Sequence, residues 1–494
     1  MEEKLNDQET IRREKLGKLK EMGVDPWGER FLRTDNSETC REKIKGKTNE
    51  ELESNHVFVT IAGRIMQIRK MGKASFFNIQ DREGKMQCYI SIDTVGQESY
   101  DVFKITDIGD ICGVYGRLML TRTGEPTIRV EKFTFLTKSL KVLPEKFHGL
   151  QDIEERSRHR YLDLIMNDES KKVAIARFKI IRSIQHYLDN LGYIEVETSV
   201  LSPILGGANA KPFITHHNAL DKDFYLRIAT ELNLKKLIVG GLEKVYEIGR
   251  IFRNEGMDAK HNPEFTTIEL YEAFGNLQSM GELWEGLIRN CCQEVCGTTK
   301  IPYGDKVLDF GPEFKWVSMA DAVKEKTGLD FTKELKVEDL VAYCKEKCIK
   351  IEKHWNTQGY FLNALFDEYC EDEMIQPTFV YGHPIEISPL TKKSKDPRFT
   401  ERFELYVNGT ELANAYTELN DPIDQKERFL AQIAAKERGD DEANEMDDNF
   451  LDALDYGMPP TGGIGMGIDR LVMFLTNQEN IREVILFPTM KDEQ

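Results

Sequence analysis

The sequence predicts an all-β barrel followed by a larger domain that combines helices with antiparallel hairpins. Three observations lead to this fold class. The chain has 494 residues, more than one hydrophobic core supports, so two or three domains are expected. Between Val57 and Thr137, apolar residues recur with the period of two that is typical of strands. In the second half, Gly249–Phe274 and Arg402–Asp421 each read as two strands joined by a polar loop.

The composition is that of a globular protein. It is 40% hydrophobic and 31% charged, and no apolar run approaches the roughly 20 residues that cross a bilayer. Met1–Lys20 is charged from its start and lacks the apolar core of a signal peptide. Nine scattered cysteines lack the spacing of a zinc site. We therefore expect a cytoplasmic protein with reduced thiols and no membrane segment.

The net charge of −18 argues against unspecific binding to a polyanion such as nucleic acid. It does not exclude nucleic acid as a partner, because binding depends on whether basic residues collect on one face.

The N-terminal region contains a helix and then five strands. The helix is predicted at Ile11–Met22, where Gly23 ends it. A second, short helix at Ser99–Thr106 falls between the third and fourth strands. This order is typical of the OB-fold, a partly open barrel that commonly binds oligonucleotides. The predicted strands begin at Val57 and then cover Ala74–Gln80, Lys85–Ile92, Ile111–Thr121 and Thr127–Thr137.

One face of this barrel is predicted to bind single-stranded nucleic acid. Basic groups suit backbone phosphates, aromatic rings stack on bases, and an amide can read base edges. Phe76 and Phe77 point to opposite faces of their strand, so we expect Phe77 in the core and Phe76 outside. The other candidate residues of this face are Arg64, Arg69, Lys70, Lys73 and Gln87.

Pro144 and the charged run that follows it indicate a linker between domains. After the linker, Asp168–Leu191 has the three- and four-residue apolar spacing of a long amphipathic helix, and Tyr193–Thr198 reads as a strand. We predict an inserted subdomain at about 300–375, which mixes short helices. The predicted divisions are residues 1–142, a linker at 143–158, and a second domain at 159–494.

The hairpin Gly249–Phe274 has one strand face that is not ordinary core. Side chains alternate along a strand, so Phe265, Glu269 and Tyr271 share a face, opposite Arg253 on the incoming strand. A carboxylate, a phenol and an aromatic ring beside a guanidinium predict a binding surface. The alternative is a surface hairpin with a solvated polar face.

The hairpin Arg402–Asp421 turns at Asn408-Gly409, the strongest short hairpin signal. This turn makes Glu404 and Glu411 diagonal neighbours on one face, where like charges repel unless a divalent cation such as Mg²⁺ binds both. The next polar residues of the strand have the opposite phase, so they join the same face only if a bulge lies near Leu412–Ala413. These residues are Asn414, Tyr416 and Glu418.

Three further segments are candidates for ligand contact. Gly207 lies among small residues that let a ligand approach the backbone or form a tight turn. Glu231 follows the predicted N-cap Thr230, where a carboxylate also favours the helix dipole. Gly463–Arg470 is a glycine-rich strand-to-helix junction that matches neither common phosphate-binding pattern, and Arg470 adds a cation at the helix start.

Together these motifs resemble the class II aminoacyl-tRNA synthetases, most closely the bacterial-type lysyl-tRNA synthetases, over nearly the whole chain. Family motif 1 corresponds to the helix and strand through Glu195 and Pro203, motif 2 to Phe252–Thr266, and motif 3 to Gly463–Arg470. The resemblance implies an α+β catalytic domain with an antiparallel sheet flanked by helices. It also implies an N-terminal anticodon-binding OB-fold and a homodimer with motif 1 at its interface.

The resemblance implies a set of ATP contacts. Arg253 would hold the α-phosphate and the amino-acid carboxylate, and Arg470 would meet the γ-phosphate, so these two are the predicted catalytic residues. Phe265 would stack on adenine, and Glu404 with Glu411 would coordinate Mg²⁺. The remaining implied contacts of ATP are Glu255, His261 and Asn262. The implied anticodon contacts are Arg69, Phe76, Gln87 and Glu125.

The acidic residues predict the amino acid. An ammonium buried among carboxylates is favoured, whereas an analogue without it leaves them unpaired. An aspartate site would need a cation, and an asparagine site an uncharged partner, so the predicted amino acid is L-lysine. The resemblance implies ATP and tRNA(Lys) as the other substrates. Tyr416 stands where many relatives have phenylalanine, and we expect it to keep the aromatic packing. The implied lysine contacts are Gly207, Glu231, Arg253, Glu269, Tyr271, Asn414, Tyr416 and Glu418.

The predicted activity is activation of lysine to lysyl-adenylate and its transfer to the 3′ end of tRNA(Lys). The alternatives are an aspartyl- or asparaginyl-tRNA synthetase of the same subgroup, and a non-catalytic nucleic-acid-binding protein on this scaffold. A paralogue that lysylates a protein is a further alternative, but such paralogues resemble the catalytic domain without the OB-fold.

Overall fold

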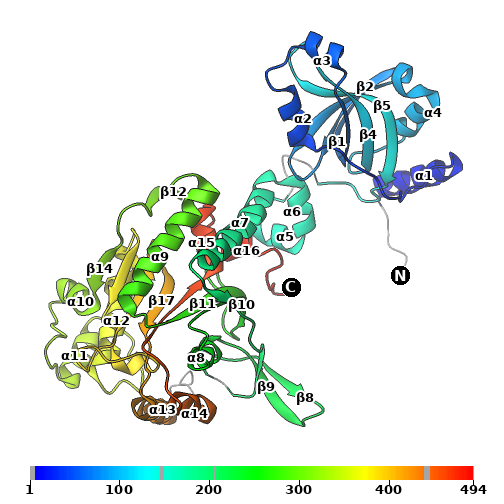
Figure 1. The fold of residues 1–494 in the computed structure, drawn as a ribbon. Coiled ribbons are helices and arrows are strands. Elements are labelled where there is room, and N and C mark those ends of the chain that lie inside the picture. The colour runs from blue at the N-terminus through cyan, green and yellow to red at the C-terminus, as the bar shows by residue number, and fades with distance from the viewer. Residues whose placement is uncertain (1–5, 145–149, 205, 209, 439–445, 493–494) are drawn as a thin grey trace. The chain divides into compact units, whose positions relative to one another are not determined.

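The computed structural model describes residues 6–144, 150–204, 206–208, 210–438 and 446–492. The chain divides into two compact units, Met1–Gln151 and Asp152–Gln494 (Figure 1). Part of the predicted linker, residues 145–149, lies outside the described residues. The predicted divisions at 142 and 158 remain a proposal. Within the described ranges, no helix combines the length and the apolar character that a membrane crossing requires.

The first unit is a closed barrel of five strands in the order β1-β2-β3-β5-β4. A helix lies between β3 and β4 in the chain, as predicted. The strands are β1 (Phe58–Met71), β2 (Ala74–Gln80), β3 (Lys85–Ser91), β4 (Ile111–Leu120) and β5 (Pro126–Thr137). The helices are α1 (Asp7–Glu21), α2 (Ser37–Ile44), α3 (Asn49–Asn55) and α4 (Ile92–Lys104).

Helix α4 begins earlier than the predicted Ser99–Thr106. Ser91 and Thr94 form a capping box that starts the helix directly after β3. Gly96 then interrupts it with a φ of 78°, a left-handed conformation that glycine adopts without strain. The sequence pattern detected only the part after this kink.

Phe77 lies in the core of the barrel with 1% of its surface exposed, as predicted, and packs on Phe103 and Phe133. The basic helix α1 docks on the same unit through its charges. Arg12 donates hydrogen bonds to the carbonyl oxygens of Ile108 and Ser139 at 2.8 and 2.9 Å. Arg12 therefore helps to hold helix α1 against the barrel.

The second unit is built on an eight-stranded sheet in the order β14-β15-β16-β17-β18-β11-β10-β6. The inner pairs are antiparallel, and the pairs at the two edges, β14 with β15 and β10 with β6, are parallel. The strands of this sheet are β6 (Ile194–Glu195), β10 (Lys244–Phe252), β11 (Glu264–Ala273), β14 (Lys315–Ser318), β15 (Thr378–Tyr381), β16 (Arg402–Tyr406), β17 (Glu411–Thr417) and β18 (Thr461–Gly467).

Helices cover one face of this sheet and enclose the main hydrophobic core (Figure 1). The covering helices α7 (Asp168–Asn190), α9 (Leu277–Cys291) and α15 (Ile468–Leu475) contribute Ile180, Trp284 and Leu471 to that core. The long helix α7 confirms the predicted amphipathic helix. Other helices of the unit are α5 (Ile153–Arg158), α6 (Arg160–Met166), α8 (Glu231–Val239), α13 (Pro422–Glu437), α14 (Asp448–Asp455) and α16 (Ile481–Val484), with a π-helical turn at Cys292–Cys296.

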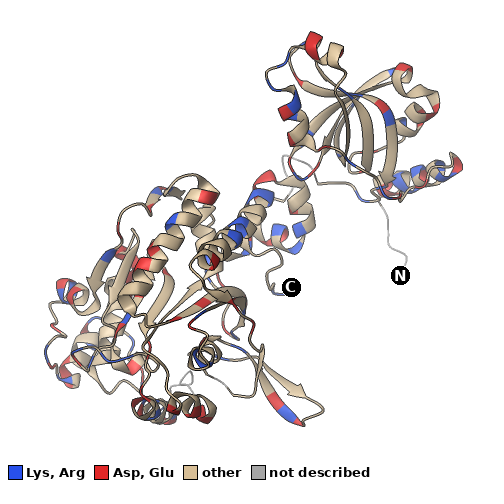
Figure 2. Ribbon diagram, in the orientation of Figure 1, with Lys and Arg blue, Asp and Glu red and all other residues tan. Residues whose placement is uncertain are grey.

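Small sheets supplement the large one. The strands β7 (Leu201–Ser202), β8 (Ile214–His217) and β9 (Lys222–Leu226) form a sheet in the order β7-β9-β8. Figure 2 shows Lys and Arg interleaved with Asp and Glu along helices of each unit.

The segment at 300–375 contributes to more than one core. The hairpin of β12 (Lys300–Tyr303) and β13 (Lys306–Asp309) packs on the main core, and β14 joins the large sheet. A separate core forms around α10 (Met319–Thr327), α11 (Val337–Glu346) and α12 (Gln358–Tyr369). The sequence pattern missed these three short strands. The inserted subdomain remains a proposal. Short 3₁₀ turns follow at Glu371–Glu373 and Ile385–Ile387.

The predicted bulge is present in the hairpin β16–β17. Asn408 and Gly409 both have positive φ, as the tight turn requires. Tyr406 pairs with Glu411 and Leu405 pairs with Ala413, so Leu412 is the extra residue. The bulge restores the phase of the strand, and Glu404 then lies opposite Asn414 and Arg402 opposite Tyr416.

A buried ion pair joins three elements of the second unit. Arg177 of α7 pairs with Asp469 at the start of α15 and donates to Thr266 Oγ1 of β11 at 3.0 Å. The other oxygen of Asp469 accepts the backbone N–H of Thr266 at 2.7 Å. Both charged side chains are buried. The ion pair between Arg177 and Asp469 therefore fixes α7, α15 and β11 relative to one another.

Replacing Arg177 by Met leaves Asp469 buried without its cation, and we expect the free energy of unfolding to fall by about 3–5 kcal/mol. Urea unfolding followed by tryptophan fluorescence measures the loss, because Trp284 lies in the adjoining core. Lys179→Met is the matched control, since Lys179 is exposed on the same helix. The control should change stability by less than about 0.5 kcal/mol. Equal losses in the two variants would contradict this role of the ion pair.

Candidate functional site

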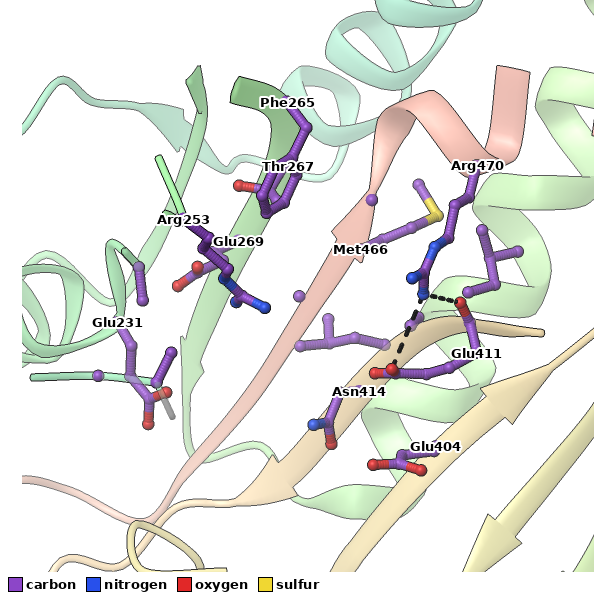
Figure 3. Close-up of a pocket in the computed structure, with 18 of the residues that line it drawn as sticks. Glu231, Arg253, Phe265, Thr267, Glu269, Glu404, Glu411, Asn414, Met466 and Arg470 are labelled. Carbon is purple, nitrogen blue, oxygen red and sulfur yellow. Dashed lines mark hydrogen bonds and ion pairs between the residues drawn. The ribbon is translucent and has the colours of Figure 1, made fainter. Parts of the chain in front are cut away.

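A cavity of ≈ 450 Å³ opens on the sheet face opposite α7 and α9 (Figure 3). Its floor is formed by β11, β17 and β18, and its rim by the loop between β10 and β11. All but one of the predicted ATP- and lysine-binding residues line it. The predicted residues that line the cavity are Gly207, Glu231, Arg253, Glu255, His261, Asn262, Phe265, Glu269, Tyr271, Glu404, Glu411, Asn414, Tyr416 and Arg470.

Two arginines line the cavity: Arg470 lies at one end beside Glu411, and Arg253 lies between Arg470 and Glu269 (Figure 3). The Arg253 guanidinium lies 5.4 Å from the ring centre of Phe265, and its buried Nε has no hydrogen-bond partner among the described residues. A buried donor without a partner costs free energy, so Arg253 is arranged for a ligand with acceptor oxygens. Arg470 donates to the backbone oxygen of Glu411 at 2.5 Å and lies 3.8 Å from its carboxylate.

The loop between β10 and β11 covers this end. Its backbone is fixed by Asn262, which is buried and donates to the carbonyl oxygen of Glu264 at 2.6 Å. The His261 Nε2 lies 3.3 Å from Arg470 Nη2, and its Nδ1 lies 2.8 Å from Asp258. Glu255 is exposed on the rim. A polar loop thus lies over a pair of cations, which is suited to a polyanionic ligand.

Glu404 and Glu411 lie on the same face of the β16–β17 hairpin because Tyr406 pairs with Glu411, and the bulge at Leu412 then brings Asn414 to that face. Burial first, and then the charge of Glu404, raise the pKa of Glu411. Glu404 accepts hydrogen bonds from Arg402 at 2.5 Å and from Tyr406 at 2.6 Å. Within the described ranges, no group of three or more His, Cys, Asp and Glu residues has the arrangement of a metal site. The two carboxylates are hard oxygen ligands that fit Mg²⁺ if a bound molecule supplies further oxygens.

The other end of the cavity is acidic. Glu269 accepts the backbone N–H of Thr230 at 3.3 Å and the Tyr271 hydroxyl at 3.5 Å. Burial first, and then the charge of Glu231, raise the pKa of Glu269 to about 7. Two carboxylates and a phenol in a region shielded from water are suited to an organic cation.

Glu418 is the predicted residue that does not line the cavity. It lies behind the wall, fully buried, and its carboxylate contacts the ammonium of Lys235. Burial first, and then Glu231, raise its pKa to about 8, although Lys235 opposes this shift. Lys235 was missed from the sequence because a lysine four residues after Glu231 reads as an ordinary helix pair.

Asn414 and Tyr416 form the side wall together with Arg402. The Asn414 amide donates to the Tyr416 hydroxyl at 3.1 Å, and Arg402 donates to Asn414 Oδ1 at 3.1 Å. The Arg402 guanidinium lies 5.6 Å from the ring centre of Tyr416, so the ring packs as expected while the hydroxyl adds a contact. Arg402 was missed, although its spacing of two from Glu404 places both side chains on one strand face.

Glycines make room for the side chains of the site. A Cβ on Gly463 would lie 2.1 Å from Glu418 Oε1 and 2.5 Å from the Tyr271 ring. Gly207 has a φ of 90° and lies against Ala229, which brings its backbone close to the cavity. The glycine-rich run is therefore a strand, β18, whose bare face allows neighbouring strands to carry large side chains.

The barrel carries two rows of side chains across β1, β2, β3 and β5. Strand register pairs Arg69 with Phe76, Phe76 with Tyr89 and Tyr89 with Arg129. The neighbouring row pairs Gln67, Asn78, Gln87 and Thr127 in the same sequence. One row is thus aromatic and basic, and the other carries three amide side chains and the buried Thr127, so aromatic, basic and amide groups lie side by side, a combination suited to single-stranded nucleic acid.

The predicted anticodon residues occupy different parts of this surface. Arg69, Phe76 and Gln87 belong to the two rows, and Phe76 is partly exposed as expected. Glu125 is exposed in the turn before β5, outside both rows. Tyr89 and Arg129 were missed because their position depends on which strands pair. Arg64 and Lys70 instead donate to the carbonyl oxygens of Gly109 and Lys104, each at 2.7 Å.

Comparisons with known proteins agree with this arrangement. Residues 152–491 match the family described as tRNA synthetases class II (D, K and N), and residues 59–136 match the OB-fold nucleic acid binding domain. The chain is 54% identical to the Lysine--tRNA ligase of Bacillus subtilis (strain 168) over 490 residues, 99% of this chain and 98% of that protein.

Other relatives are equally similar over their whole length. The identity is 56% to the Lysine--tRNA ligase of Lysinibacillus sphaericus (strain C3-41), covering 99% of this chain and 98% of that protein. It is 54% to that of Lactococcus lactis subsp. cremoris (strain SK11), covering 99% of each. These matches confirm the predicted fold class and the predicted resemblance. The chain belongs to the class II tRNA synthetases for aspartate, lysine and asparagine, and within them to the lysine–tRNA ligase family.

Proposed function

We propose that the chain activates L-lysine with ATP to form lysyl-adenylate and then transfers the lysyl group to the 3′ end of tRNA(Lys). The observation that carries this proposal is the charge pattern of one cavity, with Arg470 at one end, Glu231 and Glu269 at the other, and Arg253 between them (Figure 3). Lysine has a carboxylate and an ammonium at its two ends, which complement this pattern. The relatives named lysine–tRNA ligases support the same substrate.

The first step needs positioning and charge neutralisation. A carboxylate oxygen of lysine attacks the α-phosphorus of ATP, the bond to the β-phosphate oxygen breaks, and pyrophosphate leaves. The nucleophile is already ionised, so no protein base is required. Arg253 binds the lysine carboxylate and the α-phosphate together, Phe265 stacks on adenine, and Arg470 binds the γ-phosphate. In the second step a terminal hydroxyl of tRNA attacks the lysyl carbonyl, and AMP leaves.

Glu404 and Glu411 are the proposed ligands of Mg²⁺. The repulsion between the two neighbouring carboxylates supports a cation at this position. A bound Mg²⁺ would neutralise phosphate charge, and the phosphate oxygens would complete its coordination. Arg402 and Tyr406 orient Glu404 through its two oxygens.

Specificity for lysine is proposed to come from the acidic end. The side chain of aspartate would meet carboxylates of its own charge, and asparagine would leave them without a cation. This disfavours the two closest alternatives within the subgroup. A non-catalytic binding protein is disfavoured because Arg253, Glu411 and Arg470 are present and converge on one cavity.

The barrel is proposed to bind the anticodon of tRNA(Lys). Phe76 and Tyr89 offer two aromatic faces 5.1 Å apart at their centres, and Arg69 and Arg129 flank them in register. Bases of the anticodon would stack on these rings, and the two arginines would bind the phosphates. The amides of Gln87 and Asn78 would hydrogen-bond to the base edges.

The chain is also proposed to be a homodimer through the motif 1 segment. Four apolar residues of this segment are each at least 40% exposed: Phe178 of α7, Leu191 directly after α7, Ile194 of β6, and Val200. Exposed apolar residues that gather in one segment mark a protein contact, and β6 is an unpaired edge of the sheet.

Exchange of pyrophosphate into ATP tests the substrate directly. We expect exchange to depend on L-lysine and to be absent with aspartate or asparagine, because only lysine supplies an ammonium to the acidic end. The assay across twenty amino acids is the measurement. A response to aspartate instead would refute the proposed specificity.

Replacing Glu269 by Gln removes one carboxylate from the ammonium site. We expect the KM for lysine to rise about 10- to 100-fold and the KM for ATP to change less than about twofold. In the wild type, kcat/KM for lysine should fall as the pH drops through about 7, because Glu269 takes up a proton there. The variant lacks that step. Glu272→Gln, on the same strand but outside the cavity, is the control. An equal rise in the KM for lysine and the KM for ATP would contradict a role of Glu269 in binding the lysine ammonium.

Replacing Phe76 by Ala should weaken charging of tRNA(Lys) while exchange of pyrophosphate stays unchanged. Loss of one stacked base costs about 1–3 kcal/mol, so kcat/KM for tRNA should fall about 5- to 150-fold. Phe58→Ala is the control, an exposed aromatic residue on β1 that stacks on Tyr115 outside the two rows. A parallel loss of both steps would show that the barrel is not a separate reader of the anticodon.

A further inference from the structure

Lys235 is a buried lysine behind the acidic end of the cavity. It lies on α8, and none of its surface is exposed. Its ammonium lies 2.6 Å from Glu231 Oε1 and contacts Glu418. The rings of Tyr271 and Phe450 each have their centres 5.9 Å from it. A lysine is almost never fully buried without partners that hold its charge, and here both partners are carboxylates of the acidic end.

Glu231 connects Lys235 with the cavity. Its side chain lines the cavity, whereas Lys235 and Glu418 lie behind the wall. Glu231 and Lys235 are four residues apart and therefore share one face of α8. The carboxylate proposed to face the substrate is thus held from behind by an ammonium of the protein.

The charges around Lys235 come from several elements. Strand β11 contributes Glu269 and Tyr271, the segment after β17 contributes Glu418, and α14 packs on α8 through the uncharged Phe450. Burial first, and then repulsion from Glu231, raise the pKa values of Glu269 and Glu418 to about 7 and about 8. The charge of Lys235 lowers the pKa of Glu418. Three carboxylates and one ammonium leave an excess of negative charge for a cationic ligand.

We infer that Lys235 is a positioning residue of the amino-acid site, which holds Glu231 and Glu418 in place from behind and supplies a countercharge to these carboxylates before the substrate binds. This inference rests on the proposed function, in which that end receives the side-chain ammonium of lysine. Lys235 and the substrate are then two cations on opposite sides of one group of carboxylates. The residue acts on substrate affinity and contacts no reacting atom.

Replacing Lys235 by Met keeps the length of the side chain and removes its charge. We expect the KM for lysine in pyrophosphate exchange to rise at least about tenfold, with the KM for ATP changed less than about twofold. The midpoint of the pH dependence of kcat/KM for lysine should move up by about one to three units, because the carboxylates lose a neighbouring cation. Lys236→Met is the matched control, since Lys236 is partly exposed on the same helix and lies 3.8 Å from Asp447.

The outcomes separate the possibilities. A KM for lysine and a pH midpoint equal to those of the control would overturn the inference. An equal rise in the KM for ATP would also overturn it, because it would indicate general damage to the fold. If the wild type itself fails to respond to lysine, the proposed function fails instead, whatever the variant does.

A second variant serves if Lys235→Met does not fold, as circular dichroism would reveal. Lys235→Met combined with Glu418→Gln removes the buried ammonium together with one of its two carboxylate partners. The buried Glu418 carboxylate is then not left without a countercharge. The reference is Glu418→Gln alone, because loss of this carboxylate can itself raise the KM for lysine. In the double variant Glu231 also loses the group that fixes it, so the KM for lysine should be at least about tenfold above that of Glu418→Gln. A KM equal to that of Glu418→Gln would show that Lys235 only neutralises Glu418, and would overturn the inference.

Discussion

The ion pair between Arg177 and Asp469 is the contact on which the rest of the second unit depends. It joins residues 292 positions apart in the chain and fixes α7, β11 and α15 against one another. Asp469 directly precedes Arg470, so the same contact sets where the Arg470 guanidinium enters the cavity. Thr266 directly follows Phe265, whose side chain points the opposite way, into the cavity. The buried ion pair on the core side of the sheet thereby orients Arg470 and Phe265 on the cavity side.

The cavity works through opposite charges placed along its length. The hairpin β10–β11 supplies both of them, because Arg253 follows the incoming strand and Glu269 belongs to the outgoing strand. In a region shielded from water, these charges act more strongly than on the surface. Internal ions keep each end organised: Arg402 binds Glu404 and Asn414 at one wall, and Lys235 binds Glu231 and Glu418 behind the other.

Alternation and turn chemistry predicted much of this arrangement from the sequence. The period of two placed Glu269 and Tyr271 on one face, and the phase conflict after Glu411 required the bulge that Leu412 forms. Contacts that depend on depth or on pairing between distant strands were not predictable in this way. Phase assigns Glu418 to the correct face but cannot show that it lies behind the cavity wall, and Tyr89 and Arg129 become neighbours only through the pairing of β3 with β5. Strands as short as β14 carry too few residues for a period to be detected.

Strand β18 gives the cavity a floor of bare peptide. Gly463 and Gly465 present no side chain toward the site, and the strand is paired with β11 on one side and β17 on the other. A floor without side chains contributes to the shape of the cavity but hardly distinguishes one amino acid from another. The side chains of the cavity walls therefore determine which amino acid binds. Such a floor is compatible with aspartate, lysine or asparagine, the amino acids named for this family, and the side chains of α8, β11 and β17 then decide which one fits.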